Sequence, residues 1–549
     1  MNSMMPKRKV MFMSPYAGIW PHALPESLLA KCLDKELFEV SRVKCDGTFK
    51  EHCTVMESIA LGLEEPQLKK DEICKKCITN AQILRSSYSG KDYLISKYLT
   101  NEDLVRTDEM LASFDGVDIQ NLTYEGVEVG KIAAYEILIK FKKTSLDFND
   151  EEMKYFNTYI KHSILSLLAF IKIYKEEAPD ILITYSPQYA VNGVCARYCE
   201  LNSTRVYFIE GSSNIEERYS ALRVWDWTEF GLTNPAMKYW EPLSAETLCK
   251  SDYSRVNNHI KQLLGASSFS VYSEPASGNF DIHQHFEIPK NKKIVLASMS
   301  SYDEVYSAYF INRFPSNKYI SDVFKDQLEW IKETIHFFKD QPDLFLIVRI
   351  HPRTFPSKRN AVMALEQIEL AKIFEAPHDN VRVNTPTDKI SIYDLYSQID
   401  VLVTGWSATG VEAMTFKVPV VTYDKNLPSY PAPIHYTGST REEYFRNLLL
   451  STKAGRSGAI AEKTLGWMAF SMSVGVIRHP TLLMYSNLVV TRKIFNFLYR
   501  GFNRLFPGVV KRIEAGQNIN RAESNRINTL LATGKKSLYE VPRSLNSFN

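Results

Sequence analysis

The chain has 549 residues, a formal net charge of +3, and an ordinary composition with 45% hydrophobic and 23% charged residues. This length exceeds what one hydrophobic core supports, so we expect at least two domains. The small net charge argues against a general nucleic-acid binder, and the sequence contains no zinc-finger, RNA-recognition or helix-turn-helix pattern. No stretch reaches the roughly 18 apolar residues that span a bilayer, and no signal-peptide core follows the basic opening residues. We therefore expect a cytoplasmic protein.

The first half of the chain alternates short apolar runs with amphipathic stretches. Apolar runs of this length are typical of buried strands, and the stretches between them have helical periodicity. The alternation predicts a parallel sheet in a Rossmann-like domain over residues 1–275. The predicted elements are strands at 9–14, 180–185 and 205–209, and helices at 25–37, 154–175 and 188–201.

The second half repeats this alternation of strands and helices with a clearer pattern. Residues 266–288 are rich in Ser, Gly and polar residues without periodicity, so we place the domain boundary there. A second Rossmann-like domain is predicted over residues 285–450. Its predicted elements are strands at 293–298, 344–350, 381–383, 401–404 and 419–423, and helices at 323–338, 361–374, 392–399 and 410–416.

Two turns in the second half follow predicted strands directly, where open α/β sheets bind ligands. The first turn contains Arg349, His351, Pro352 and Arg353 in the run RIHPR. Guanidinium and imidazole groups at this position favour binding of a nucleotide phosphate or base. The alternative is that Pro352 begins a helix and His351 is an ordinary surface residue.

The second turn, TGWSATGVEA, opens a predicted helix at residues 404–413. Ser407, Thr409 and Gly410 are small, so backbone amides at the helix start stay open to a phosphate. Glu412 offers a carboxylate to the ribose hydroxyls of the same nucleotide. The alternative for Glu412 is that it only complements the helix dipole.

The run RIHPR, followed by TGWSATGVEAMTFKVPVV, resembles the nucleotide-binding half of bacterial capsule polysaccharide synthesis transferases. The resemblance covers residues 180–423, and the group includes β-Kdo transferases and shares motifs with bacterial sialyltransferases. It implies a GT-B type fold, in which two Rossmann-like domains face a cleft. It also implies a glycosyltransferase that uses a nucleotide-activated sugar, with a CMP-sugar favoured and UDP- or GDP-sugars left open. The implied acceptor is a growing or lipid-linked bacterial surface polysaccharide.

A transferase of this kind needs a general base for the acceptor hydroxyl. Glu210 and Gly211 follow the predicted strand 205–209 and resemble the acidic-Gly motif of these transferases, although Ile209 stands where they commonly carry a second acid. We predict that Glu210 is the base, with His22 as the second candidate. The alternative is that Glu210 is a solvated carboxylate in a turn.

The sequence contains no Asp-x-Asp triplet, which commonly holds a divalent cation on a nucleotide diphosphate. We therefore expect no catalytic metal. Four cysteines, Cys45, Cys53, Cys74 and Cys77, form a Cys-rich insertion at about 45–80. Such a set predicts a structural zinc ion or, less favoured, an iron–sulfur cluster. Unliganded buried thiols are the alternative.

Residues 451–549 are predicted to form a helical tail. Between residues 465 and 513 the sequence has basic and aromatic residues but no acidic residue. This mixture favours an anionic membrane surface, peripheral on the inner face of the cytoplasmic membrane. The alternative is that residues 465–490 pack back on the first domain. Residues 514–549 have little hydrophobic content, so we expect them to be disordered.

Two other functions fit the predicted fold. A sugar-nucleotide epimerase also uses two Rossmann halves, but it has no use for a basic aromatic tail. A non-catalytic scaffold of a polysaccharide assembly complex would keep the fold without a working base. Two phosphate-type turns, one acidic turn and the tail together favour the glycosyltransferase.

Overall fold

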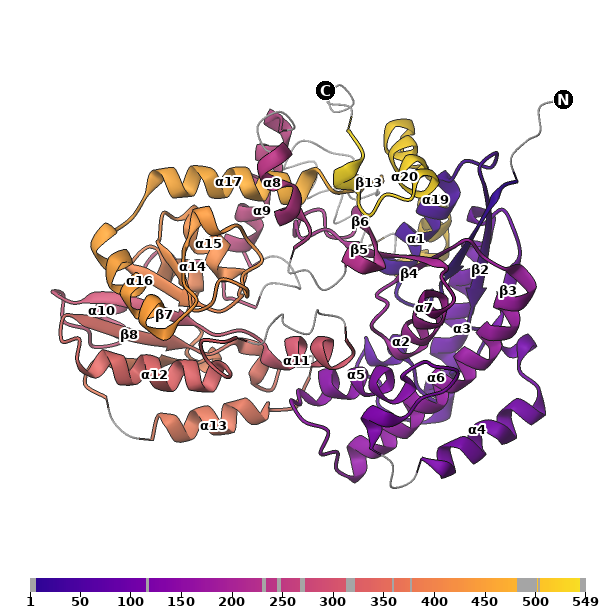
Figure 1. Ribbon diagram of the computed structural model, residues 1–549, viewed down its shortest axis with the longest axis horizontal. Coiled ribbons are helices and arrows are strands. Elements are labelled where there is room, and N and C mark those ends of the chain that lie inside the picture. The colour runs from indigo at the N-terminus through magenta and orange to yellow at the C-terminus, as the bar shows by residue number, and fades with distance from the viewer. Residues whose placement is uncertain are drawn as a thin grey trace.

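The computed structural model describes most of the chain as two α/β domains side by side (Figure 1). The first domain lies at the right of this view and the second at the left. The described residues are 6–114, 118–229, 234–243, 248–266, 272–312, 321–357, 360–375, 378–480, 501 and 504–543.

The first domain is built on a sheet of seven strands among the described residues. The strands are β1 (Arg8–Met13), β2 (Phe38–Lys44), β3 (Asp92–Leu94), β4 (Ile181–Tyr185), β5 (Arg205–Gly211), β6 (Ala221–Asp226) and β13 (Ile477–Arg478). Their order is β13-β6-β5-β4-β1-β2-β3. The five strands from β3 to β5 are parallel, whereas β6 and β13 extend the sheet with antiparallel pairings. The order of the parallel strands is that of a Rossmann fold, and it reverses between β1 and β4.

Helices cover both faces of this sheet. They are α1 (Trp20–Cys32), α2 (Thr54–Glu57), α3 (Gln67–Ile83), α4 (Asn101–Ser113), α5 (Val129–Phe141), α6 (Asp150–Glu177) and α7 (Ala190–Leu201). Successive residues of β1 enter opposite cores, with Met11 and Met13 on one face and Val10 and Phe12 on the other. Residues 45–80, expected as an insertion, contain α2 and α3 and so belong to the helical connection between the parallel strands β2 and β3.

The second domain is built on a six-stranded parallel sheet among the described residues. The strands are β7 (Lys293–Ser298), β8 (Leu344–Arg349), β9 (Val381–Asn384), β10 (Val401–Thr404), β11 (Val420–Thr422) and β12 (Tyr436–Thr437). Their order, β12-β11-β10-β7-β8-β9, is the full Rossmann order, and it reverses between β7 and β10. The five strands predicted from the sequence coincide with β7 to β11.

The helices of the second domain include two that the sequence analysis assigned to the first domain. The two are α8 (Ala236–Leu243) and α9 (Lys250–Leu264). The other helices of this domain are α10 (Ile282–His285), α11 (Tyr302–Phe310), α12 (Gln327–Lys339), α13 (Leu365–Ile373), α14 (Ile392–Tyr396), α15 (Thr409–Thr415), α16 (Arg441–Ala454) and α17 (Gly458–Ser473). Val256 and Leu263 of α9 share a core cluster with Leu402 of β10. The chain therefore changes domain between β6 and α8, earlier than the expected boundary at 275–285.

The predicted tail is divided between the two domains. Helix α17 packs on α9 and α15 of the second domain, and β13 then joins the first sheet. The last helices, α19 (Pro507–Gly516) and α20 (Arg521–Thr533), lie beside the first domain (Figure 1). Ile527, Leu530 and Leu531 are fully buried in the same core as β1. The expected disorder after residue 514 is therefore wrong up to residue 543, because these apolar residues of α20 cover one face of the first sheet.

The two domains meet where α11 lies against α5 (Figure 1). Side chains cross this contact in both directions. The Arg353 guanidinium donates a hydrogen bond to the Ile139 carbonyl at 2.9 Å, and the Lys142 ammonium donates one to the Phe355 carbonyl at 2.9 Å. The chain therefore has two Rossmann-like domains that face each other and touch through α5 and α11, which confirms the expected GT-B type fold.

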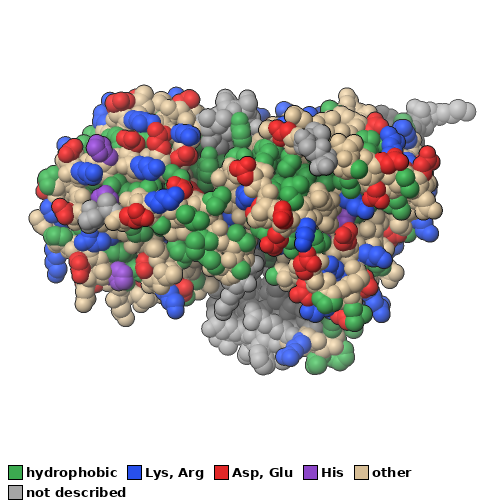
Figure 2. Space-filling view, turned by 90° about the horizontal axis from the view of Figure 1, so that it is seen from below, with side chains coloured by type: hydrophobic (Ala, Val, Ile, Leu, Met, Phe, Trp, Pro, Cys, Tyr) green, Lys and Arg blue, Asp and Glu red, His purple; other side chains and the backbone are tan. Residues whose placement is uncertain are grey.

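The surface of the two domains carries mixed charge. Figure 2 shows Lys and Arg side chains interspersed with Asp and Glu over both halves of the face that it presents. None of the helices in the described part of the chain has both the length and the apolar character that crossing a membrane requires. Residues 481–500 and 502–503 of the basic and aromatic stretch predicted to bind a membrane lie outside the described residues.

Candidate functional site

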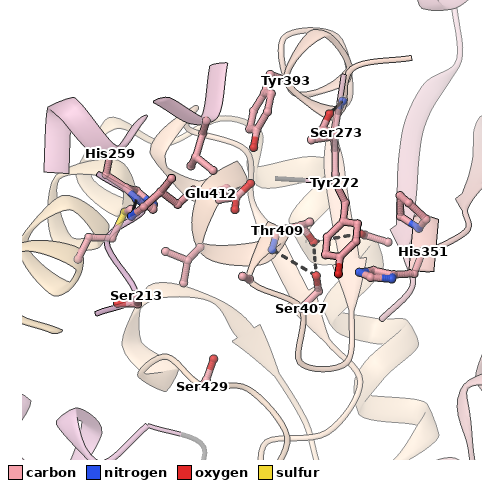
Figure 3. A pocket seen from close by; sticks show the side chains of 18 of the residues that line it. Ser213, His259, Tyr272, Ser273, His351, Tyr393, Ser407, Thr409, Glu412 and Ser429 are labelled. Carbon is pink, nitrogen blue, oxygen red and sulfur yellow. Dashed lines mark hydrogen bonds between the residues drawn. The ribbon is translucent and has the colours of Figure 1, made fainter. Parts of the chain in front are cut away.

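A cavity of about 350 Å³ opens at the carboxyl ends of β7, β8 and β10 (Figure 3). This is the point where the strand order of the second sheet reverses. Adjacent strands there send their following loops in opposite directions, which leaves a crevice between them. Both predicted turns reach this cavity, through Arg349, His351 and Pro352 from one and Ser407, Thr409 and Glu412 from the other. We call it the second-domain cavity.

Arg349, the last residue of β8, brings a buried positive charge to the cavity wall. Its side chain donates hydrogen bonds to the Asn384 amide oxygen and, at 3.1 Å, to the Ile390 carbonyl. Arg349 is 9% exposed. Burial lowers the pKa of its guanidinium to about 10, so the group stays charged at neutral pH. Both hydrogen-bond partners are neutral, and the charge is therefore available to an anion.

His351 presents a neutral imidazole to the same cavity. Its Nδ1 accepts a hydrogen bond from the Arg353 backbone N–H at 3.2 Å, which leaves the ring proton on Nε2. Burial lowers the pKa of His351 to about 4, and the nearby Arg353 and Arg349 charges add to this. The Tyr272 ring lies beside the imidazole, with centroids 5.5 Å apart (Figure 3). His351 is thus a hydrogen-bond donor at neutral pH without carrying charge.

Hydroxyl groups from two loops meet on the next part of the wall. The Thr409 hydroxyl lies 2.9 Å from the Ser407 hydroxyl and 3.0 Å from the Ser298 hydroxyl (Figure 3). The helix that follows is only seven residues long, so these hydroxyls matter more than its dipole. Gly410 does not line the cavity and has a packing role, since a Cβ there would lie 2.2 Å from the buried Tyr430 hydroxyl oxygen.

Glu412 projects from α15 toward Tyr393 (Figure 3). Burial raises the pKa of Glu412 to about 7, while hydrogen bonds with the Tyr393 and Tyr396 side chains lower it. The carboxyl group therefore exchanges a proton near neutral pH. It can accept or donate a hydrogen bond to a hydroxyl-bearing ligand.

Several residues of this cavity carried no sequence signal. His259 on α9 accepts a hydrogen bond from the Ile215 backbone N–H at 3.0 Å, and burial lowers its pKa to about 4. Trp467 and Met468 of α17 close the cavity from the predicted tail. Such residues follow no motif, because they reach the cavity only when α9 and α17 pack over the second sheet. Arg218, which lies shortly after Glu210 and Gly211 in the sequence and could steady an anionic ligand, also lines it.

Arg353 lies on the opposite side of the turn from its predicted partners. Its guanidinium pairs with the Asp303 carboxylate at 2.8 Å and does not line the second-domain cavity. Instead it lines a cavity of about 460 Å³ in the first domain. That cavity, the first-domain cavity, lies after β1 and β4, where the first sheet reverses its strand order. One turn thus contributes to both cavities.

The two candidate bases occupy different places. His22 lines the first-domain cavity and stacks on Tyr185, with ring centroids 4.2 Å apart. Burial and, secondarily, the Arg218 charge lower the pKa of His22 to about 4. Glu210 is the second-last residue of β5, one strand away from the reversal, where its 40% exposed side chain pairs with Arg223 at 3.2 Å. It lines neither of the two cavities, and its role as a base stays a prediction.

The four cysteines of the predicted metal site line one small apolar cavity of about 20 Å³. Burial raises the pKa of each thiol, to about 12 for Cys45. In the described part of the chain, no three His, Cys, Asp or Glu side chains are arranged so that they could hold a metal ion. A structural zinc ion or iron–sulfur cluster at Cys45, Cys53, Cys74 and Cys77 stays a prediction, which metal analysis of the purified protein tests.

No known protein family and no curated protein matches this chain. Among solved structures, it is similar to the β-Kdo 2,7 transferase of Thermosulfurimonas dismutans KpsC, with 16% identity, 65% of this chain and 98% of that chain covered, and a TM-score of 0.32. A putative UDP-N-acetylglucosamine 2-epimerase from Listeria monocytogenes has 12% identity, with 85% and 91% covered and a TM-score of 0.25. A UDP-GlcNAc 2-epimerase from Neisseria meningitidis bound to UDP-GlcNAc has 10% identity, with 85% and 96% covered and a TM-score of 0.27. Likenesses this weak carry no argument about activity.

Proposed function

We propose that the chain is a glycosyltransferase that moves a sugar from a nucleotide-activated donor to a growing or lipid-linked bacterial surface polysaccharide. The observation that carries this proposal is the buried Arg349 guanidinium, which lines the second-domain cavity with neutral partners only. A buried cation is costly unless a counter-charge pairs with it directly, and the Asp388 carboxylate acts on Arg349 electrostatically without being one of these hydrogen-bond partners. A phosphate group in the cavity supplies that charge together with strong hydrogen bonds.

The other groups of this cavity suit the remainder of a nucleotide. The His351 Nε2–H and the Ser407 and Thr409 hydroxyls donate to phosphate oxygens, and the Glu412 carboxyl group binds ribose hydroxyls. The resemblance of the two turns favours a CMP-sugar, with UDP- and GDP-sugars as alternatives. We propose that no catalytic metal is required, because Arg349 and these neutral donors meet the charge of the phosphate.

The acceptor binds in the first-domain cavity, on the other side of the His351–Arg353 turn. In the transfer step, an acceptor hydroxyl oxygen forms a bond to the anomeric carbon of the donor sugar. The bond between that carbon and the phosphate oxygen breaks, and its electron pair leaves with the phosphate. The hydroxyl proton passes to a base, for which Glu210 is the first candidate and His22 the second.

A membrane-bound acceptor fits the surface around α19. Leu505, Phe506, Val509 and Ile513 are exposed large hydrophobic side chains, and the basic residues Arg504 and Arg512 lie among them in the sequence. Exposed apolar side chains with neighbouring cations favour the interface of an anionic membrane. We propose that the protein works at the inner face of the cytoplasmic membrane through this region.

The first test is a thermal-shift screen against CMP, CDP, UDP, GDP and their sugar conjugates. A ligand that binds only the folded protein raises its melting temperature. We expect a CMP-dependent rise that is lost in His351→Ala and kept in His435→Ala. His435 is a matched control, because it is, like His351, a half-buried histidine of the second domain whose pKa burial lowers to about 4, but it lies outside the cavity.

Each other outcome selects a different function. A rise with UDP or GDP alone discards the cytidine donor, and no rise with any nucleotide favours a scaffold. Conversion of the donor sugar without an acceptor indicates an epimerase. A sugar-transfer assay of Glu210→Gln then tests the base, for which we expect a fall of about 100-fold. An unchanged rate in Glu210→Gln with a fall in His22→Asn assigns the base to His22.

A further inference from the structure

The first-domain cavity has a wall whose charge indicates what it binds. Its lining residues come from the loops after β1 and β4, from α1, α2, α5 and α7, from Tyr219, and from Arg353 and Asn360 of the second domain. The cavity shares the His351–Arg353 turn with the second-domain cavity, because Arg353 lines one and His351 lines the other. Residues two apart in a chain lie within about 7 Å, so the two cavities are adjacent at this turn.

Two buried polar atoms at this cavity have no hydrogen-bond partner among the described residues. One is Oε1 of Glu26, a residue that is 3% exposed, whose Oε2 accepts a hydrogen bond from the Ser14 hydroxyl. The other is Oδ1 of Asn192, a residue that is 7% exposed, whose Nδ2 donates to the Tyr185 carbonyl at 2.7 Å. Buried polar atoms in native proteins are almost always paired. An occupant of the cavity that carries hydrogen-bond donors would pair both.

The cations at this cavity already have partners. The Lys140 ammonium lies 2.9 Å from the Glu57 carboxylate, and the Arg353 guanidinium lies 2.8 Å from the Asp303 carboxylate. His22 is neutral at pH 7, since burial lowers its pKa to about 4. Arg218, whose charge acts on His22, lines the second-domain cavity instead. A negatively charged ligand would therefore lose its hydration without gaining an unpaired cation on this wall.

The Glu26 carboxyl group on the wall is also held neutral, whereas the Glu57 carboxylate is paired with Lys140. Burial raises the pKa of Glu26 to about 8, against the smaller opposing effect of its hydrogen bond from Ser14. A protonated Glu26 donates as well as accepts a hydrogen bond. Tyr185 and Tyr189 add aromatic surface beside these groups. Neutral donors and acceptors next to aromatic rings suit a ligand that has many hydroxyl groups and no charge.

We propose that the first-domain cavity selects an uncharged sugar unit of the acceptor, with Glu26 and Asn192 hydrogen-bonded to its hydroxyl groups. This inference rests on the proposed function, in which the same cavity holds the acceptor. It adds the class of substrate, which excludes an acidic sugar at this position. It also assigns specificity to two residues outside every motif in the sequence.

The test measures binding of methyl glycosides to the full chain at pH 7, with CMP present, by saturation-transfer NMR. The probes are the methyl glycosides of glucose, galactose, mannose and N-acetylglucosamine, together with methyl glucuronide and methyl galacturonide. We expect at least one neutral glycoside to bind, and its matched uronide to bind at least about tenfold more weakly. Equal or tighter binding of the uronide, or no binding of any neutral glycoside, overturns the proposal.

Variants locate the bound sugar. We expect Glu26→Ala and Asn192→Ala each to weaken binding of the neutral glycoside about tenfold, and Glu26→Gln to stay within about threefold, because a neutral amide replaces a neutral acid. Glu177→Ala is the matched control, since Glu177 is a buried glutamate of the same domain that accepts a hydrogen bond from the Tyr93 hydroxyl outside the cavity. Unchanged affinity in both Glu26→Ala and Asn192→Ala overturns the assignment.

The same samples separate this inference from the proposed function. The rise in melting temperature with CMP reports the second-domain cavity only. A normal rise without glycoside binding removes the sugar site and leaves a nucleotide-dependent enzyme. Selective binding of a neutral glycoside without any nucleotide effect removes the proposed transferase and leaves the sugar site.

Discussion

The two cavities occupy equivalent positions in two similar sheets but differ in charge. Each lies where the strand order of its sheet reverses, between β1 and β4 in one domain and between β7 and β10 in the other. The second-domain cavity has the buried Arg349 charge, whose hydrogen-bond partners are neutral. In the first-domain cavity, Lys140 and Arg353 are paired with carboxylates.

This difference shows that the fold determines where a cavity forms, whereas the side chains determine the charge of its wall. The reversal of strand order opens a crevice in both domains without regard to the ligand. The residues that follow each strand then decide whether the crevice favours an anion or a neutral molecule. The predictions below test that assignment, from the largest expected effect to the smallest.

Removing the charge of Arg349 should abolish the difference between the cavities. We expect Arg349→Met to weaken nucleotide binding about 100-fold or more, because charge-assisted hydrogen bonds contribute about 1.5 to 3 kcal/mol each. Isothermal titration calorimetry with the nucleotide from the thermal-shift screen measures this effect. Glycoside binding in the first-domain cavity should not change.

Arg456→Met is the matched control for this substitution. The Arg456 guanidinium also has neutral partners, since it donates to the carbonyls of Phe416, Tyr396 and Ile399, but it does not line the cavity. We expect nucleotide affinity within about twofold of the wild type in this variant. Equal losses in both arginine variants would mean that the effect is on folding and not on an anion site.

The neutral state of the first-domain cavity can be tested through the pH dependence of stability. The folded pKa of Glu26 is raised from 4.5 to about 8 by burial. Its contribution to stability is therefore fully present below about pH 4.5 and is lost as the pH rises through 8. Glu26→Gln removes this titration. We expect the variant to gain about 4 kcal/mol over the wild type in free energy of unfolding between pH 5 and pH 9.

Urea denaturation at several pH values measures this difference directly. The two proteins should have similar stability at pH 5, where the wild-type carboxyl group is protonated in the folded state. A constant difference between them across the whole pH range would contradict a buried neutral Glu26. The first-domain cavity would then contain a carboxylate without a paired cation, and its wall would not be neutral as proposed.

Arg353 should behave as a residue of the contact between the cavities and not of the nucleotide site. We expect Arg353→Met to lower kcat for transfer about tenfold, because its bonds to Asp303 and to the Ile139 carbonyl hold the two domains in register. The nucleotide-dependent rise in melting temperature should persist. Arg441→Met is the control, since Arg441 makes a similar pair of bonds, to Glu329 and to the Val323 carbonyl, within the second domain. A loss of nucleotide binding in Arg353→Met would place Arg353 in the donor site after all.

The sequence predicted the two cavities unequally, for a physical reason. The second-domain cavity takes its motif residues from two short runs that directly follow buried strands, so a strand pattern and a turn pattern together locate them. The first-domain cavity takes Ser14, Glu26, Glu136 and Asn192 from separate elements. Such residues become neighbours only through packing of the helices on the sheet, which no local pattern records.

For residues 465–490 of the predicted tail, the sequence left packing on the first domain open as the alternative to membrane binding. Strand β13 joins the first sheet as that alternative expects, whereas α17 packs on the second domain. Trp467 was counted among the aromatic residues of a membrane-binding tail, but in the structure it is 2% exposed and closes the second-domain cavity. Arg478 was counted among its basic residues, but it pairs with the buried Glu217 at 3.0 Å. A basic and aromatic composition is therefore typical both of a segment that binds a membrane surface and of a helix and strand that connect two domains. Only tertiary contacts distinguish them.

The hydroxyl groups of the second-domain cavity should contribute least. We expect Thr409→Val to weaken nucleotide binding about fivefold, because a neutral hydrogen bond contributes a net of about 1 kcal/mol. Thr415→Val is the matched control on the same helix, where the hydroxyl donates to the Glu412 carbonyl at 2.7 Å outside the cavity. Calorimetry should show an effect in the first variant only. If Thr409→Val matched the loss in Arg349→Met, the hydroxyl pair would be the main anion ligand, and the contrast between the cavities would not depend on a buried charge.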